Sequence, residues 1–62
     1  MEFGNQIKML RTNFKMSQEE LANRFNVSRQ AVQKWEAGIT APDIHTLIEI
    51  SKFFGVPIDY LV

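Results

Sequence analysis

The chain has 62 residues, contains no cysteine and only two prolines, and carries no net charge. Without cysteine, neither a disulfide framework nor a thiolate metal site can form. No apolar run approaches the roughly 20 residues of a membrane span, and the opening MEFGNQIKML lacks the layout of a signal peptide. These absences predict a cytoplasmic protein with no membrane association, and the length predicts one domain over residues 1–62.

The ingredients of an enzyme site are also scarce. His45 is the only histidine, and the sequence supplies no companions for a metal site or a catalytic base. Ser17 and Ser28 precede helical patterns and are expected to act as caps, and there is no phosphate loop of the G-x-x-x-x-G-K type. We therefore expect no enzymatic activity, no metal and no cofactor, with His45 solvated or near a phosphate.

Charge is distributed unevenly along the chain, although the total is zero. Residues 8–34 carry six basic and two acidic side chains, a net +4, whereas residues 35–62 carry one basic and four acidic side chains, a net −3. One interpretation is a basic face on a neutral body, and the other is chance scatter on a solvated surface. The zero total argues against a protein that binds polyanions without selectivity.

Apolar residues recur at helical spacing, and no alternating run of β-branched residues predicts a strand. A helix over about residues 3–14 would bury one stripe made of Phe3, Ile7, Leu10 and Phe14. The SQEE segment at residues 17–20 has the spacing of a capping box, in which Ser17 and Glu20 satisfy each other's backbone N–H groups. It predicts the start of a second helix.

The link between the second and third helices is very short. Asn26 tolerates the left-handed backbone that closes a helix, and Ser28 can cap the next one only two residues later. This third helix, about residues 28–37, would end at Gly38. Two helices joined by so short a turn have the layout of a helix-turn-helix unit.

The third helix has two distinct sides. The buried side would consist of Ala31, Val32 and Trp35, which favours core packing for the tryptophan over stacking on a base. An arc of about 140° opposite would consist of Arg29, Gln30, Gln33 and Lys34. From the pattern alone, this polar arc is either a solvated surface or a surface that contacts DNA.

A fourth helix over about residues 43–54 would be capped by Asp43 and ended by Gly55. Its buried residues would be Ile44, Leu47, Ile48, Ile50 and Phe54. Pro57 begins a last short turn that directs Leu61 to the core. The sequence thus predicts an all-α domain of five short helices.

Three segments together resemble the XRE family of phage-repressor and Cro-like helix-turn-helix domains. They are MSQEELANRFNVSRQAVQKWEAG, the Pro-Asp pair before the fourth helix, and the closing FFGVPIDYL. The family usually has glycine where this chain has Asn26 and alanine where it has Ser51. Both changes are expected to be tolerated, because asparagine accepts the left-handed backbone and a serine hydroxyl can bond its own helix.

The resemblance implies a lambda-repressor-like helix-turn-helix fold that places the third helix in the major groove of double-stranded DNA. It makes Arg29, Gln30 and Lys34 the residues that read base edges. Contacts to phosphate would come from Gln18, Ser28 and Gln33. The resemblance also implies that Gln18 braces the third helix, although Gln18 could instead be ordinary helix surface. The resemblance also pairs Arg11 with Glu36, whereas Arg11 taken alone could equally contact a phosphate.

Two functions are consistent with these residues. The first is sequence-specific DNA binding by a bacterial or phage transcriptional regulator, most simply a repressor-like homodimer on a palindromic operator. An arginine can pair with two acceptors of guanine, and a glutamine with the edge of adenine. The second is an antitoxin or protein-interaction adaptor on the same fold, which the zero net charge favours. The apolar ending IDYLV leads us to expect that the natural protein continues into a further C-terminal domain.

Overall fold

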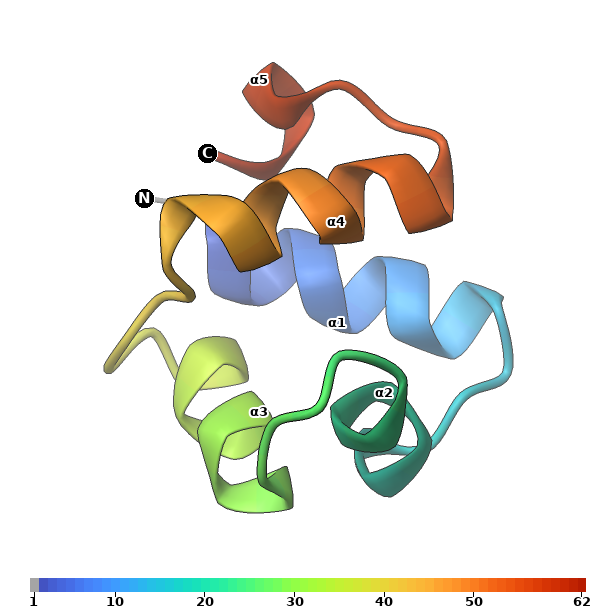
Figure 1. The fold of residues 1–62 in the computed structure, drawn as a ribbon, viewed down its shortest axis with the longest axis vertical. Helices are drawn as coiled ribbons and strands as arrows, with labels where there is room; N and C mark the ends of the chain where they lie inside the picture. The colour runs from blue at the N-terminus through green and yellow to red at the C-terminus, as the bar shows by residue number, and fades with distance from the viewer. Residues whose placement is uncertain (1) are drawn as a thin grey trace.

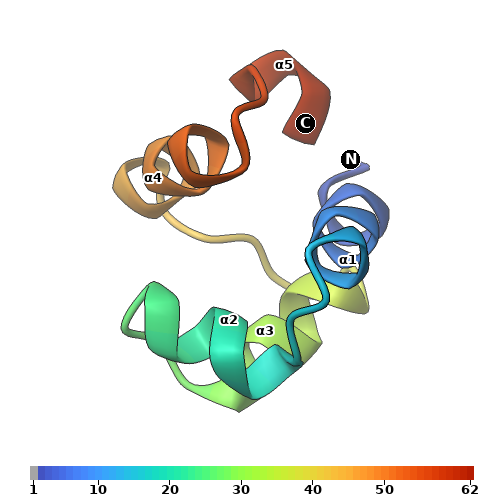
Figure 2. The ribbon, with the colours of Figure 1, turned by 90° about the vertical axis from the view of Figure 1, so that its right-hand side faces the viewer.

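The computed structural model describes residues 2–62, which form five α-helices and no strand. The helices are α1 (Phe3–Asn13), α2 (Gln18–Arg24), α3 (Arg29–Glu36), α4 (Ile44–Phe54) and α5 (Ile58–Leu61). Both ribbon views place α2 and α3 together at one end of the molecule and α5 at the opposite end, with α1 and α4 between them (Figures 1 and 2). The predicted all-α class with five short helices is confirmed.

Three of the helices begin at side-chain caps that the sequence predicts. The Ser17 hydroxyl accepts the Glu20 N–H at 3.0 Å, and the Glu20 carboxylate accepts the Ser17 N–H at 2.8 Å, which completes the capping box. Ser28 and Asp43 each accept the backbone N–H three residues on, at 3.1 and 2.9 Å. Because such a cap contributes about 1 kcal/mol, these short helices begin at defined residues.

The two residues that depart from the usual family pattern are both accommodated. Asn26 adopts the left-handed backbone with φ of 58°, as expected for the residue that ends α2. The Ser51 hydroxyl lies on the buried side of α4 and donates to the Ile48 carbonyl at 2.8 Å. Its polar group is therefore satisfied inside its own helix, as the sequence predicts.

A single core joins all five helices. Its eleven buried apolar side chains are Phe3, Ile7, Leu10, Leu21, Ala22, Val32, Trp35, Leu47, Ile50, Phe54 and Leu61. Trp35 is only 4% exposed, and its ring meets that of Phe3 edge to face with centroids 6.0 Å apart. The tryptophan is thus a core residue, which confirms the packing interpretation over stacking on a base.

Two apolar residues predicted to be buried are exposed. Phe14 lies just past the end of α1 and is 49% exposed, because Lys15 takes a left-handed backbone (φ of 58°) and turns the chain away there. Ile44 is 66% exposed. It is the first residue of α4 and lies about 70° from the centre of the buried side of that helix. The predictions for Phe14 and Ile44 were therefore wrong.

Candidate nucleic-acid interface

The outer side of α3 gathers polar side chains on one surface. Its members, here called the α3 arc, are all exposed and consist of Arg29, Gln30, Gln33 and Lys34. On the opposite side, Val32 is fully buried and Trp35 nearly so, which fixes the rotation of the helix. The structure therefore brings together on one exposed surface the three predicted base-reading residues and Gln33.

The chemistry of the α3 arc is that of a surface that can recognise hydrogen-bonding edges. Arg29 carries a planar fork of donors, a glutamine amide offers both a donor and an acceptor, and Lys34 carries a compact positive charge. Neither cation forms an ion pair within residues 2–62. Both charges are thus available to an anionic or acceptor-rich partner.

A partly buried polar cluster lies where α3 ends. Arg11 donates to Glu36 through Nε at 2.6 Å and Nη2 at 3.2 Å, and its Nη1 donates to the Met16 carbonyl at 2.8 Å. The side-chain amide of Gln18 donates to the same carboxylate at 3.0 Å. We call these four residues the Glu36 network, and they connect α1, the start of α2 and the end of α3.

The Glu36 network contains the ion pair and the bracing of the third helix by Gln18 that the family resemblance implies, and one contact that sequence reasoning missed. The Arg11–Glu36 ion pair is present, with side chains 12% and 6% exposed. The contact of Arg11 with the Met16 carbonyl has no sequence signal, and neither does the choice of Glu36 as the partner of Gln18. Gln18 and Glu36 lie 18 residues apart and on different helices.

The ion pair also changes how the charge count should be interpreted. Arg11 belongs to the basic first half of the sequence, yet its charge is paired and largely shielded from solvent. The other basic residues of that half are exposed and are Lys8, Lys15, Arg24, Arg29 and Lys34. The count of +4 therefore overstates the positive surface, and a single basic face stays a prediction.

The residues predicted to contact phosphate differ in how free their polar groups are. The Ser28 oxygen is occupied as the cap of α3, but the hydroxyl is exposed and can still donate outward. Gln33 is exposed on the α3 arc, whereas Gln18 is half-buried and gives one N–H to Glu36. Their contacts with phosphate remain predictions.

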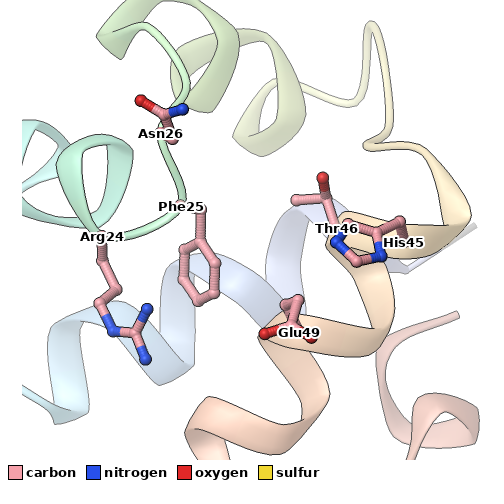
Figure 3. Close-up of a pocket in the computed structure, with 6 residues that line it drawn as sticks. All are labelled: Arg24, Phe25, Asn26, His45, Thr46 and Glu49. Carbon is pink, nitrogen blue, oxygen red and sulfur yellow. The ribbon is translucent and has the colours of Figure 1, made fainter.

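A hollow of about 190 Å³ lies between the end of α2 and the start of α4. Figure 3 shows its two walls, lined by Arg24, Phe25 and Asn26 on one side and by His45, Thr46 and Glu49 on the other. The Arg24 guanidinium is held over the Phe53 ring, 4.7 Å from its centre. No residue of α3 lines this hollow, so it is separate from the α3 arc.

His45 has no neighbouring side chains that could complete a metal site among the described residues. Residues 2–62 contain no group of three or more histidine, cysteine, aspartate or glutamate side chains placed to hold an ion. His45 itself is exposed in the first turn of α4. Over the same residues, every helix falls short of the length and apolarity that crossing a bilayer requires.

Comparisons with known proteins identify the fold family. A family model described as "Helix-turn-helix" matches residues 7–61. The HTH-type transcriptional activator BcrR of Enterococcus faecalis is 47% identical over 62 residues, which are 100% of this chain and 30% of that protein. The SPbeta prophage-derived uncharacterized HTH-type transcriptional regulator YonR of Bacillus subtilis (strain 168) is 37% identical over 60 residues, 97% of this chain and 56% of that protein.

The cryptic phage CTXphi transcriptional repressor RstR of Vibrio cholerae is likewise 37% identical over 60 residues, 97% of this chain and 54% of that protein. The chain thus spans between 30% and 56% of the length of these three relatives. The match covers all five helices except the first turn of α1. Together with the five-helix fold, it establishes that this chain belongs to the XRE-type helix-turn-helix family.

Proposed function

We propose that this chain is the DNA-binding domain of a cytoplasmic transcriptional regulator and recognises a specific sequence of double-stranded DNA. The observation that carries the proposal is the α3 arc, a polar exposed surface on a helix whose other side is locked into the core. An α-helix with such a surface fits the major groove, where each base pair presents a distinct pattern of donors and acceptors. The printed names of the relatives, activator, regulator and repressor, support this assignment.

Each residue of the proposed interface has a role that its chemistry suits. Arg29 would donate to O6 and N7 of a guanine, and Gln30 would pair with N6 and N7 of an adenine. Lys34, farther along the helix, would reach a third base edge. Phosphate contacts that set the position of α3 without choosing a sequence would come from Gln18, Ser28 and Gln33.

We further propose that two copies of the chain bind a palindromic operator as a homodimer. A helix of eight residues can contact only a few base pairs, so a second copy adds both affinity and specificity. The proposal includes no catalytic step. An antitoxin or adaptor function has less support, because the names of the relatives describe transcriptional regulators.

Selection of bound duplexes from a random pool tests the proposal directly. We expect enrichment of a short sequence, arranged as an inverted repeat, and an affinity for it that falls as salt rises. Titration of the enriched duplex against a scrambled duplex of equal length is the control. Equal affinity for both would overturn sequence-specific binding, and enrichment of an unrepeated sequence would overturn the homodimer alone.

A further inference from the structure

We propose that Glu36 is a positioning residue for DNA binding, which acts through Gln18 without touching DNA itself. Its carboxylate holds the Gln18 side-chain amide at the start of α2, so that the second N–H of that amide can donate to a phosphate oxygen of the DNA backbone. This inference rests on the proposed function. According to this inference, Glu36, at the opposite end of the helix-turn-helix unit, sets the conformation of Gln18 in the unbound protein.

The geometry of the Gln18–Glu36 contact leaves part of the amide unused. Nε2 of Gln18 donates to Oε1 of Glu36 at 3.0 Å. A glutamine amide carries two N–H donors, and only one is directed at the carboxylate. Gln18 is half-buried, and among residues 2–62 its amide donates to no acceptor other than Glu36. The second donor is therefore available to a ligand.

Glu36 is itself held in place, which makes it an effective anchor. Two nitrogens of Arg11 donate to its two carboxylate oxygens, and the third guanidinium nitrogen is fixed on the Met16 carbonyl. No buried side-chain polar atom of the described residues lacks a partner. A carboxylate held from α1 cannot turn freely, and as a charged acceptor it forms stronger hydrogen bonds than a neutral one.

The consequence of this anchoring is preorganisation. A solvated glutamine samples several rotamers and loses that freedom when it binds a phosphate. Here the rotamer is already selected by folding, so the loss is not incurred on binding. Because Glu36 is the last residue of α3, the same contact also fixes the spacing between the Gln18 amide and the base-reading residues Arg29 and Gln30.

A double-mutant cycle separates positioning from stability. Removing the carboxylate alone would strand Arg11, so we replace both partners with apolar residues in Arg11→Met/Glu36→Leu, a change that folded proteins often tolerate. Affinity for the selected duplex is measured for this variant, for Gln18→Met and for the triple variant, at a temperature where circular dichroism shows each to be folded. We expect about threefold to tenfold loss in each of the first two, the size of one hydrogen bond. The triple variant should lose no more than Gln18→Met does.

The matched control uses another glutamine. Gln33 is exposed on the α3 arc and is not bonded to Glu36, so losses from Gln33→Met and from the apolar pair should multiply. Multiplying losses for Gln18 as well would overturn the inference, as would an unchanged affinity in the folded apolar-pair variant. If the parent prefers no duplex, the result contradicts both the proposed function and this inference. If it does prefer one, these results concern Glu36 alone.

Duplexes with a single neutral methylphosphonate provide a second readout. The phosphate that Gln18 contacts is the one whose replacement weakens the parent but not Gln18→Met. Glu36→Gln keeps an oxygen acceptor for Gln18 and gives up the charge that Arg11 pairs with, so it should melt lower yet retain sensitivity at that phosphate. Loss of that sensitivity in Glu36→Gln while it is folded would overturn the positioning role.

Discussion

At the scale of single residues, Arg29 is where the proposed interface is most open to test. It lies in the first turn of α3 and is exposed, and its guanidinium can bind two acceptors of one guanine. We expect Arg29→Ala to cost about 1–3 kcal/mol of binding free energy and to relax the preference at a single base pair. Titrations against the selected duplex and its single-base variants measure both effects.

The control for Arg29 is Gln33→Ala, a change on the same exposed surface at a residue assigned to phosphate. It should weaken binding to all duplexes by a similar factor and leave the preferred sequence unchanged. An Arg29→Ala variant that also loses affinity uniformly would show that the arginine contacts only the backbone. One that binds every duplex as the parent does would remove α3 from the interface.

A second residue-scale prediction concerns Asp43, the cap of α4. Hydrogen bonding from the side chain of Thr46 and, to a smaller extent, from its backbone N–H lowers the pKa of Asp43 below its ordinary value of 3.8. A carboxyl whose folded pKa is the lower one stabilises the fold above its unfolded pKa, and this contribution is lost as pH falls through the folded value.

We therefore expect the melting temperature of Asp43→Asn to depend less on acid than that of the parent. Asparagine is also a good cap, so α4 should still begin at the same residue. Thermal melts followed by circular dichroism between about pH 5 and pH 2 should show that the difference between the two melting temperatures narrows as pH falls. Asp59→Asn removes an exposed carboxylate elsewhere and is the control. A difference that stays constant would contradict the prediction.

At the scale of helices, the packing of α1 against the end of α3 depends on Gly4. A Cβ at this position would lie 2.6 Å from the Trp35 carbonyl oxygen and 3.0 Å from that of Glu36. Both atoms belong to the backbone, so a side chain can be accommodated only if the two helices separate. The closest approach of α1 and α3 thus requires glycine, although glycine is a poor helix former.

Gly4→Ala should destabilise the domain by about 1–3 kcal/mol from overpacking, of which up to about 1 kcal/mol is offset by the better helix propensity of alanine. Urea denaturation measures the change in the free energy of unfolding. Asn5→Ala, at the exposed neighbouring position of α1, changes propensity without the clash and should be neutral or slightly stabilising. If Gly4→Ala were as stable as Asn5→Ala, α1 could move away from α3 without lowering the free energy of unfolding, which would contradict the prediction.

The starts of helices could be predicted from the sequence because capping is local. Ser17, Ser28 and Asp43 each bond a group only three residues away, so the pattern of residues suffices. Exposure depends on what lies across from a residue, which periodicity does not contain. Ile44 has the spacing of a buried residue but lies at the edge of the core.

The candidate site also has one part that the sequence predicts and one part that it does not. The α3 arc follows from helical periodicity, since the four exposed residues and the buried Trp35 lie on opposite sides of one helix. The Gln18–Glu36 contact joins α2 to α3, and the close approach at Gly4 joins α1 to backbone atoms of α3. Such contacts are set by the crossing of helices, which no short segment determines.

At the scale of the whole molecule, the dimer hypothesis predicts the spacing of the operator. Two copies related by a two-fold axis would place their α3 helices in successive major grooves on one side of DNA, about 34–36 Å apart. Selected sites should therefore contain inverted half-sites whose centres lie about 10 base pairs apart. Sedimentation of the complex should give two chains per duplex. A duplex with one half-site deleted is the control, and undiminished binding to it by a single chain would contradict the dimer.

The dimensions of the domain, 24 × 23 × 20 Å, limit how much information one copy can extract from DNA. At 3.4 Å per base pair, its longest dimension faces about seven base pairs. Each fully determined position supplies two bits, so one copy can specify at most about 14 bits. Choosing one address among roughly 10⁶–10⁹ competing sites requires about 20–30 bits. However tightly it binds, one domain of this size cannot specify a single site in a genome. Unique recognition requires base contacts from a second DNA-binding domain.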